Sequence, residues 1–288
     1  MISLLRKAFY LSLLIAIPFA MPLHVWSSTR KLLLFAGVAS KPPTEEAIQD
    51  FRRKTGISVE VVFGGSGFVL SQMKLTKRGD IYFPASSDFM EMAKREGLVF
   101  TESERRVAYL IPSINVQKGN PRGIHSLKDL TREGIRIAIA NPEMVAIGLY
   151  AVEIVEKNFT PAEKERFRRN IVNYTESFEK TVNALSFRAV DTVIGWKVFQ
   201  YWDPERIESI DLRPEEIPRI GYISIAISRF TKDKPSAQRF VDFLLSPQGK
   251  SAFRKYQYMM EIEEARRFTK PDTPVGGEYV LPKEWKTR

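Results

Sequence analysis

Short apolar segments alternate with helical segments from residue 31 onward, and few folds accept such an order. The apolar run 31–36 (KLLLFA) predicts a buried strand, and Pro42 and Pro43 then open a helix that ends at Gly56. The same order repeats further along. The predicted strands are 31–36, 57–63 and 80–83, and the predicted helices are 42–55, 68–76 and 86–96. Alternating strands and helices joined by short loops predict an α/β fold with a doubly wound sheet.

A second set of strands and helices follows. Its predicted strands are 108–117, 135–140, 192–196 and 220–228, and its predicted helices are 148–157, 178–187, 234–245 and 250–256. Long segments near 105–117 and 216–228 link the two sets, so we expect two lobes with a ligand cleft and two crossover segments. We assign residues 28–108 and 223–288 to lobe 1 and residues 109–222 to lobe 2. The tail after Met260, rich in proline, glycine and charge, is expected to wrap the surface.

The first 27 residues form a predicted signal peptide. Arg6 and Lys7 make a short positive region, residues 8–20 carry no charge, and Val25-Trp26-Ser27 offers a cleavage site. Extending the apolar run to Trp26 leaves a second interpretation, an uncleaved membrane anchor. Under both interpretations we expect the remaining chain to lie outside the cytoplasmic membrane, in the periplasm or an equivalent extracytoplasmic space.

The composition excludes several kinds of site. The 288 residues contain no cysteine and two histidines, His24 and His125, which excludes disulfides, cysteine-based zinc sites and a thiol nucleophile. The chain has 44 Lys and Arg against 34 Asp and Glu, a formal charge of +10. Such a charge suggests an acidic partner, but basic and acidic residues are interspersed, as in residues 163–166, which is typical of solvated helix faces. We expect no nucleic-acid partner, no cofactor and no metal bound by the protein itself.

Four loops follow the ends of predicted strands, where ligands bind in open α/β sheets. They are residues 37–40, 64–67, 141–148 and 196–197, and the first three lead into helices. A helix start presents unpaired backbone N–H groups and a partial positive charge, while glycine and serine allow close approach and add neutral donors. Together these loops could bind an oxyanion without any basic residue.

Each loop also has a purely structural interpretation, and an enzyme is a further alternative. Residues 64–67 can be a plain turn with Ser66 as the N-cap of its helix, and Trp196 can belong to the core. The run 64–68 (GGSGF) approaches the Gly-x-Ser-x-Gly nucleophile motif, but Phe68 replaces the last glycine. A serine hydrolase would need His125 as its base, and this residue is more typical of a surface loop or cap. We therefore predict a binding protein rather than an enzyme.

Several segments, taken in order, resemble a known protein family. They are LLLFAGVAS, FRRKTGISVEVVFGGSG, GDIYFPASSDFMEMAKREGLV, IAIANPEMVAIGLYAVEIVEK, TVIGW and FVDFLLSPQGKSAFRKYQY. Over residues 31–258 the chain resembles the periplasmic substrate-binding proteins of ABC importers, and among them the molybdate/tungstate-binding family. The run at 141–151 is the more specific marker, whereas the run at 240–249 occurs across many binding proteins. The resemblance implies a two-lobe, periplasmic-binding-protein-like α/β fold.

The resemblance also implies which residues hold a ligand. In this family serine hydroxyls, backbone N–H groups and a tyrosine hydroxyl hold an oxyanion between the lobes. The corresponding positions and their neighbours are Ala39 and Ser40, Ser66 and Gly67, Ala146 and Ile147, and Trp196. A further backbone donor falls near Glu179. The chain departs from the family at Ala39, which lacks a hydroxyl, and at Trp196, which offers an indole N–H in place of a phenol.

The resemblance therefore implies an extracytoplasmic substrate-binding component of an ABC importer that captures molybdate or tungstate. We expect a monomer that docks on a membrane permease, and no metal beyond the metal centre of the oxyanion. A receptor for sulfate or phosphate remains an alternative, as does a ligand-sensing domain that keeps its N-terminal anchor. A secreted serine hydrolase using Ser66 is the weaker alternative.

Overall fold

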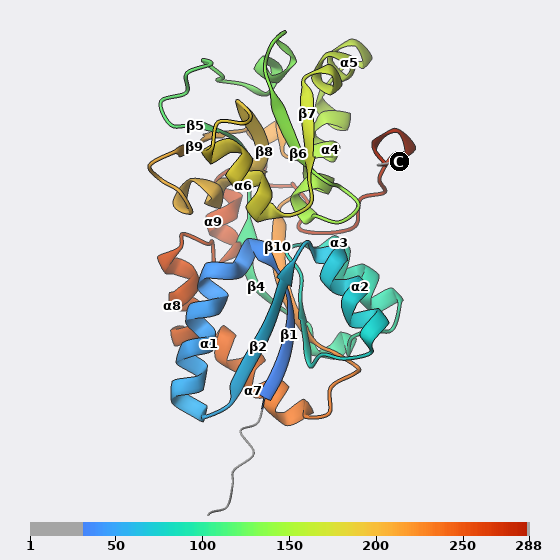
Figure 1. Cartoon of the computed structure of the whole chain (residues 1–288), viewed down its shortest axis with the longest axis vertical. Coiled ribbons are helices and arrows are strands. Elements are labelled where there is room, and N and C mark those ends of the chain that lie inside the picture. The colour runs from blue at the N-terminus through green and yellow to red at the C-terminus, as the bar shows by residue number, and fades with distance from the viewer. Residues whose placement is uncertain (1–30, 287–288) are drawn as a thin grey trace, which may run out of the picture.

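The computed structural model describes residues 31–286, and this part of the chain forms two lobes, each built on a five-stranded sheet (Figure 1). The predicted two-lobe α/β fold is confirmed. The predicted signal peptide, residues 1–27, lies outside the described residues. Within residues 31–286, every helix is too short or too polar to span a lipid bilayer.

The sheet of lobe 1 has the strand order β2-β1-β3-β10-β4. Its strands are β1 (Lys31–Gly37), β2 (Ser58–Gly64), β3 (Ile81–Phe83), β4 (Arg105–Leu110) and β10 (Gly221–Ile227). Strand β1 pairs in parallel with β2 and β3, whereas β10 runs antiparallel to β3 and β4. Its helices are α1 (Lys41–Thr55), α2 (Ser66–Thr76), α3 (Ser87–Arg95), α7 (Lys234–Leu245) and α8 (Pro247–Lys255). Figure 1 shows α1 and α8 on one side of this sheet and α2 and α3 on the other, which explains why β1 is almost uniformly apolar.

The sheet of lobe 2 has the strand order β7-β6-β8-β5-β9. Its strands are β5 (Pro112–Gln117), β6 (Ile137–Ala140), β7 (Ile171–Thr175), β8 (Thr192–Trp196) and β9 (Ile207–Asp211). Strand β6 is parallel to β7 and β8, and β5 is antiparallel to β8 and β9. The helices of this lobe are α4 (Ala146–Asn158), α5 (Pro161–Arg169) and α6 (Phe178–Ser186). In both lobes, therefore, parallel strands end at the edge that faces the other lobe.

The predicted single strand at 108–117 is wrong. The chain forms β4 up to Leu110 in lobe 1 and β5 from Pro112 in lobe 2, with Ile111 between the two sheets. A proline has no N–H for the ladder of a continuous strand, so a change of pairing partner at this point costs little. The predicted lobe boundaries, after residues 108 and 222, fall close to the changes of sheet and remain predictions.

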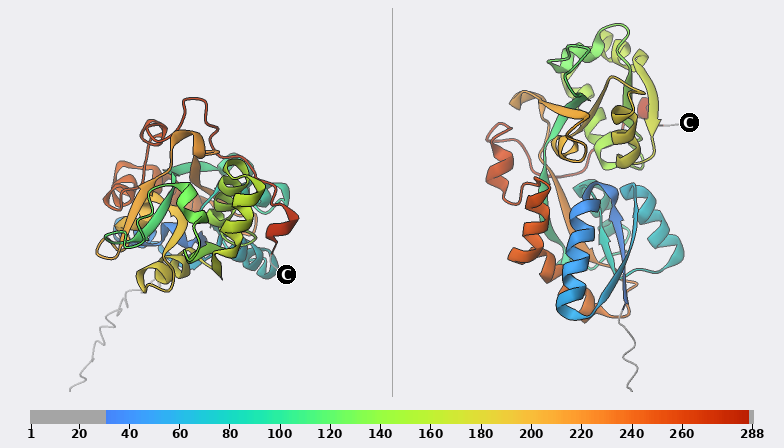
Figure 2. Two further views of the ribbon diagram at one scale, coloured as in Figure 1. Left: turned by 90° about the horizontal axis from the view of Figure 1, so that it is seen from above. Right: turned by 60° about the vertical axis from the view of Figure 1, so that its left-hand side comes forward.

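The tail after Met260 contains a short helix, α9 (Ile262–Arg266), and a 3-10 helix, η6 (Lys283–Trp285). It leaves lobe 1 after α8 and ends against lobe 2, where Trp285 is buried beside Phe167 (Figure 2). Trp285 belongs to the apolar cluster that fills the distal part of lobe 2, whereas the larger cluster fills lobe 1 and extends across the interface to Trp196. The tail is thus part of the packing of both lobes.

Candidate functional site

A small cavity lies between the lobes, where the carboxyl ends of strands from both sheets meet. Lobe 1 contributes Val38, Ala39, Gly64, Gly65, Ser66 and Ala85, and lobe 2 contributes Val145, Ala146, Ile147, Phe178 and Trp196. These residues end or follow β1, β2 and β3 in lobe 1 and β6, β7 and β8 in lobe 2. The position matches the general rule for ligand sites in open α/β sheets.

The cavity brings together most of the residues predicted to bind ligand, namely Ala39, Ser66, Ala146, Ile147 and Trp196. Ser40 and Gly67 do not line it. The Ser40 hydroxyl donates to the carbonyl oxygen of Gly37 at 3.1 Å, and the Gly67 N–H donates to the carbonyl oxygen of Met144 at 3.0 Å. His125, the base that a hydrolase would need, lies outside the cavity lining on an exposed loop.

Ser66 is the first residue of α2, and the N-cap is Gly65, so the interpretation of Ser66 as an N-cap is wrong. Its hydroxyl oxygen accepts the N–H of Ala85 at 3.0 Å, and the residue is 1% exposed. A serine hydroxyl that accepts one bond keeps its own hydrogen as a donor. The bond to Ala85 therefore fixes the hydroxyl at the cavity and leaves its O–H for a ligand.

The start of α4 supplies backbone donors from lobe 2. Ala146 and Ile147 occupy its first turn. The backbone N–H groups of a first turn have no hydrogen-bond acceptor within the helix. Gly148 permits this placement, because a Cβ there would lie 2.2 Å from the carbonyl oxygen of Ala140 on β6. The helix can therefore start tightly against the strand and aim its partial positive charge at the cavity.

Trp196 ends β8 and is fully buried. Its ring meets the ring of Tyr150 edge-on with centroids 4.8 Å apart, and its distal edge lies against Gly221, where a Cβ would come within 2.9 Å. The indole N–H has no hydrogen-bond partner among residues 31–286. A buried N–H without a partner is costly, and a ligand acceptor would remove that cost.

Tyr258 supports the loop of lobe 1 that carries Ala39. Its hydroxyl donates to the carbonyl oxygen of Ala39. Burial raises the pKa of Tyr258, so the phenol stays protonated and remains a donor. This hydrogen bond fixes the short 3-10 helix η1 (Val38–Ser40) at the edge of the cavity.

The two lobes are closed on one another in this structure. The cavity volume is about 10 Å³, which is room for one water at most. Gly65 is required at this contact, because a Cβ there would lie 2.6 Å from the carbonyl oxygen of Met144. At the rim, Lys41 Nζ of lobe 1 lies 3.7 Å from Glu179 Oε1 of lobe 2. A ligand with several oxygens would need the loops to separate slightly.

The lining carries neutral donors and no charged side chain. Across the described residues, no cluster of three or more acidic or histidine side chains could hold a metal ion. The arrangement can bind an anion through backbone N–H groups, a hydroxyl and an indole N–H, with helix starts supplying the positive potential. It offers no base and no nucleophile–base pair.

Sequence reasoning missed two parts of this cavity. One is Ala85, which follows β3 and donates to Ser66, and the other is Phe178 at the start of α6. Both occupy strand-end positions equivalent to those of the predicted loops. The signal for Ala85 was available, since the short strand at 80–83 and the helix after it were both predicted.

Comparisons with known proteins identify the family of the chain. Residues 32–258 match the family described as bacterial extracellular solute-binding protein. A putative binding protein of Haemophilus influenzae is 27% identical over 227 residues, which span 77% of this chain and 88% of that protein. The molybdate-binding protein ModA of Rhodobacter capsulatus is 22% identical, over 76% of this chain and 84% of its own. The resemblance inferred from the sequence is confirmed by these relatives.

Solved structures share the two-lobe fold. The periplasmic molybdate-binding protein of Azotobacter vinelandii has a TM-score of 0.69 at 18% identity, covering 80% of this chain and 99% of that one. The sulfate-binding protein SubI of Mycobacterium tuberculosis has a TM-score of 0.72 at 13% identity, covering 86% and 94%. At such identities the structures establish the fold alone. The family match over residues 32–258 shows that the chain belongs to the bacterial extracellular solute-binding protein family.

Proposed function

We propose that this protein is the extracytoplasmic substrate-binding component of an ABC importer and that it captures a tetrahedral oxyanion, molybdate or tungstate, between its lobes. The observation that carries the proposal is the buried, unpartnered indole N–H of Trp196, a residue that lines the cavity together with Ser66 and the start of α4. These are neutral hydrogen-bond donors from both lobes. They suit reversible capture of an anion.

The size of the site supports a small inorganic ligand. Pockets that hold drug-sized organic molecules enclose about 300–1,000 Å³, whereas this cavity holds about 10 Å³ in the closed protein. A modest opening would admit a compact ion and not a large metabolite. The relatives include proteins named for molybdate and for sulfate, both of which are tetrahedral oxyanions.

The departures from the family pattern bear on selectivity. Ala39 contributes no hydroxyl, and Trp196 and Phe178 make the wall more apolar than a wall with a tyrosine. Fewer hydroxyl donors leave more of the recognition to backbone N–H groups, whose positions are fixed by the helix starts. We infer that pocket size rather than charge separates molybdate and tungstate from sulfate.

Capture requires movement of one lobe relative to the other. The chain passes from the sheet of lobe 1 to the sheet of lobe 2 at Ile111, between β4 and β5. It returns to lobe 1 in the segment between β9 and β10. Hinge closure at such crossovers buries the ligand and joins donors from both lobes. We propose that the closed form docks on the permease.

Isothermal titration calorimetry of the full chain against molybdate, tungstate, sulfate and phosphate tests the proposal. We expect molybdate and tungstate to bind at least about tenfold more tightly than the other two, a difference of about 1.4 kcal/mol. Tighter binding of sulfate or phosphate would assign the protein to another anion. Heat from none of the four would exclude the oxyanion function. The mass of the mature N-terminus then separates a cleaved receptor from an anchored sensor.

A further inference from the structure

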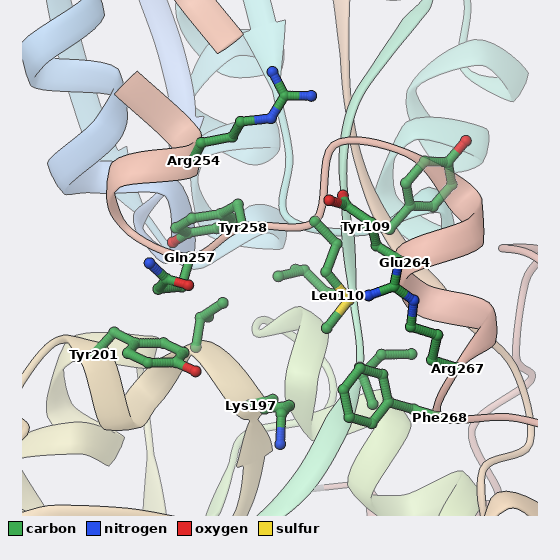
Figure 3. Close-up of a pocket in the computed structure, with 13 residues that line it drawn as sticks. Tyr109, Leu110, Lys197, Tyr201, Arg254, Gln257, Tyr258, Glu264, Arg267 and Phe268 are labelled. Atoms are coloured by element: carbon green, nitrogen blue, oxygen red, sulfur yellow. The ribbon is translucent and has the colours of Figure 1, made fainter. Parts of the chain in front are cut away.

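A second and larger cavity lies on the α9 side of the two crossovers, between the same two lobes (Figure 3). Its volume is about 400 Å³, within the range of pockets that hold small organic molecules. It is bounded by the end of α8, the crossover at Tyr109–Ile111, the 3-10 helix η4 (Lys197–Tyr201) and α9. None of these residues lines the cavity at Ser66.

Some charged groups at this cavity have hydrogen-bond or ion-pair partners within the protein, and one does not. Lys197 is paired with Asp211, and the Glu264 carboxylate accepts backbone N–H groups at the start of α9. The backbone N–H of Arg267 donates to the carbonyl oxygen of Ala265, but its guanidinium makes no hydrogen bond, ion pair or ring contact with any residue of the described chain. Figure 3 shows its guanidinium pointing from α9 toward the middle of the cavity. The cavity therefore contains a guanidinium group without a side-chain partner, and its planar set of N–H donors matches the oxygens of a carboxylate or phosphate group.

Aromatic side chains line the same cavity, and the Lys197 ammonium lies 4.8 Å from the ring centroid of Phe268. Phe268 follows Arg267 on the same side, and Tyr201 of lobe 2 faces Gln257 of lobe 1 across the gap in Figure 3. Tyr201 is 41% exposed although it is a large aromatic residue. Gln257 has a left-handed backbone with φ of 62°, which a glutamine rarely adopts, and this conformation places it at the cavity.

We propose that this cavity is a second ligand site, which binds an organic anion that carries one carboxylate or phosphate group on an aromatic or planar apolar body. Arg267 holds the anionic group, and Tyr201 and Phe268 contact the body. The site differs from the oxyanion site, where the donors are neutral and the space is far smaller. The proposal does not depend on which oxyanion the first site takes.

The two sites share a wall, so their ligands should influence one another. Lys197 at this cavity directly follows Trp196, and Tyr258 at this cavity donates its hydroxyl hydrogen to the carbonyl of Ala39. The second cavity is formed by both lobes in the closed structure, so its ligand would favour closure. Coupling of this kind is reciprocal, and each ligand should tighten or leave unchanged the binding of the other.

Calorimetry of the full chain with benzoate and with phenyl phosphate, each in the absence and presence of saturating molybdate, tests the site. We expect one or both to bind with a Kd of about 1 mM or tighter, and molybdate not to displace them. The preferred probe distinguishes a carboxylate from a phosphate site. Phenol, which lacks the charge, and inorganic phosphate, which lacks the ring, should bind at least about tenfold more weakly.

Variants locate the binding. Arg267→Gln should lower the affinity for the probe by about tenfold or more. Tyr201→Ser should lower this affinity as well. Lys270→Gln, an exposed lysine on the same tail outside the cavity, should leave the affinity unchanged. Binding of neither probe, equal affinity in Arg267→Gln, or displacement by molybdate would overturn the proposal. A protein that binds a probe at Arg267 and no oxyanion would retain this site while losing the proposed function.

Discussion

The Nε of Arg219 donates a hydrogen bond to Oε2 of Glu153 at 2.6 Å, which joins a crossover segment to α4 of lobe 2. The same guanidinium donates from Nη1 to Oδ2 of Asp88, on α3 of lobe 1, at 3.0 Å. It also lies 4.0 Å from the ring centroid of Tyr150. Burial acts to lower the pKa of Arg219, but Tyr150, Asp88 and Glu153 together raise it, so the buried group stays charged. One cation thus links both lobes beside the crossover.

Arg219→Met should destabilise the protein strongly. Removing the guanidinium leaves the buried carboxylate of Asp88 without a cationic partner and Glu153 with the exposed Lys157 alone, and loss of a buried partner costs about 3–5 kcal/mol. Lys157→Met is the matched control, because Lys157 also pairs with Glu153, at 2.9 Å, but its side chain is 54% exposed. The control should cost less than about 1 kcal/mol. Urea unfolding measures both variants, and equal costs would show that burial of Arg219 does not determine its contribution.

The central elements of the fold were predictable because they are apolar and bounded by turn residues. Strand β8 and helix α7 have the predicted limits, and the end of α1 is set by Gly56 in a left-handed conformation. Strand β7 was not predicted, and within helix α5 only the mixed-charge run 163–166 was interpreted as a helix face. Val172 and Tyr174 are exposed on β7, an edge strand, and six of the nine residues of α5 are charged, so neither shows the apolar periodicity of a buried element.

The location of the cavity was predictable, but the direction of each donor was not. Strand ends and helix starts follow from the sequence pattern, and the chain brings Ser66 and Ile147 together as expected from that rule. Ser40 and Gly67 have the same local chemistry as the lining residues. Their donors are taken by the carbonyls of Gly37 and Met144, and the second of these bonds crosses between the lobes. Such tertiary choices leave no local sequence signal.

Ser66→Ala should weaken binding of molybdate by about 1–3 kcal/mol, because a buried ligand oxygen loses its hydroxyl donor. The variant also removes the acceptor for the Ala85 N–H, so a fall in stability is expected and should be measured by urea unfolding. Ser40→Ala is the control, since its hydroxyl bonds to Gly37 outside the cavity lining. If calorimetry finds the affinity for molybdate unchanged in both Ser66→Ala and Ser40→Ala, the Ser66 hydroxyl has a structural role only.

Trp196→Phe should separate ligand binding from stability. The variant lacks the unpartnered indole N–H, so the affinity for molybdate should fall about tenfold. Stability without ligand should change little, because loss of the unpaired N–H favours the variant while the smaller ring leaves a cavity against Tyr150. Calorimetry and urea unfolding test the two parts. A fall in stability with unchanged affinity would assign Trp196 to the core alone.

Gly65→Ala should block closure of the lobes. The new Cβ would lie 2.6 Å from the Met144 carbonyl oxygen across the interface, so the closed form would be disfavoured and the affinity reduced by about tenfold or more. Gly64→Ala is the control, because the nearest atoms to its Cβ belong to Phe68, at 2.8 Å, and Val69, at 3.1 Å, both in lobe 1, so the added methyl group does not meet lobe 2. Small-angle scattering with molybdate should show contraction in the control and none in Gly65→Ala. Contraction in both would mean that closure does not need this contact.

Trp285→Ala should destabilise lobe 2 although the residue lies at the end of the tail. Its ring is 2% exposed and packs near Phe167, with the Arg168 guanidinium 4.6 Å from its centroid, so truncation should cost about 3–5 kcal/mol. Its indole N–H donates to Oε1 of Glu156 at 2.7 Å. We expect faster hydrogen exchange in α4 and α5, and unchanged exchange there would place the tail outside the cooperative unit.

Trp285→Phe removes the hydrogen bond from the indole N–H to Glu156 and keeps most of the ring. The contribution of this bond to stability should depend on pH. Burial acts to raise the pKa of Glu156, but Lys164 and Trp285 lower it below its ordinary value of 4.5. A carboxyl with a depressed pKa in the folded protein stabilises it above the unfolded pKa, and this contribution is lost as the pH falls through the folded value. The stability difference between the native protein and Trp285→Phe should therefore be largest near neutral pH and should shrink below about pH 4.5. Urea unfolding at neutral and acidic pH measures the difference, and a constant value would show that the indole N–H does not act through the ionised carboxylate.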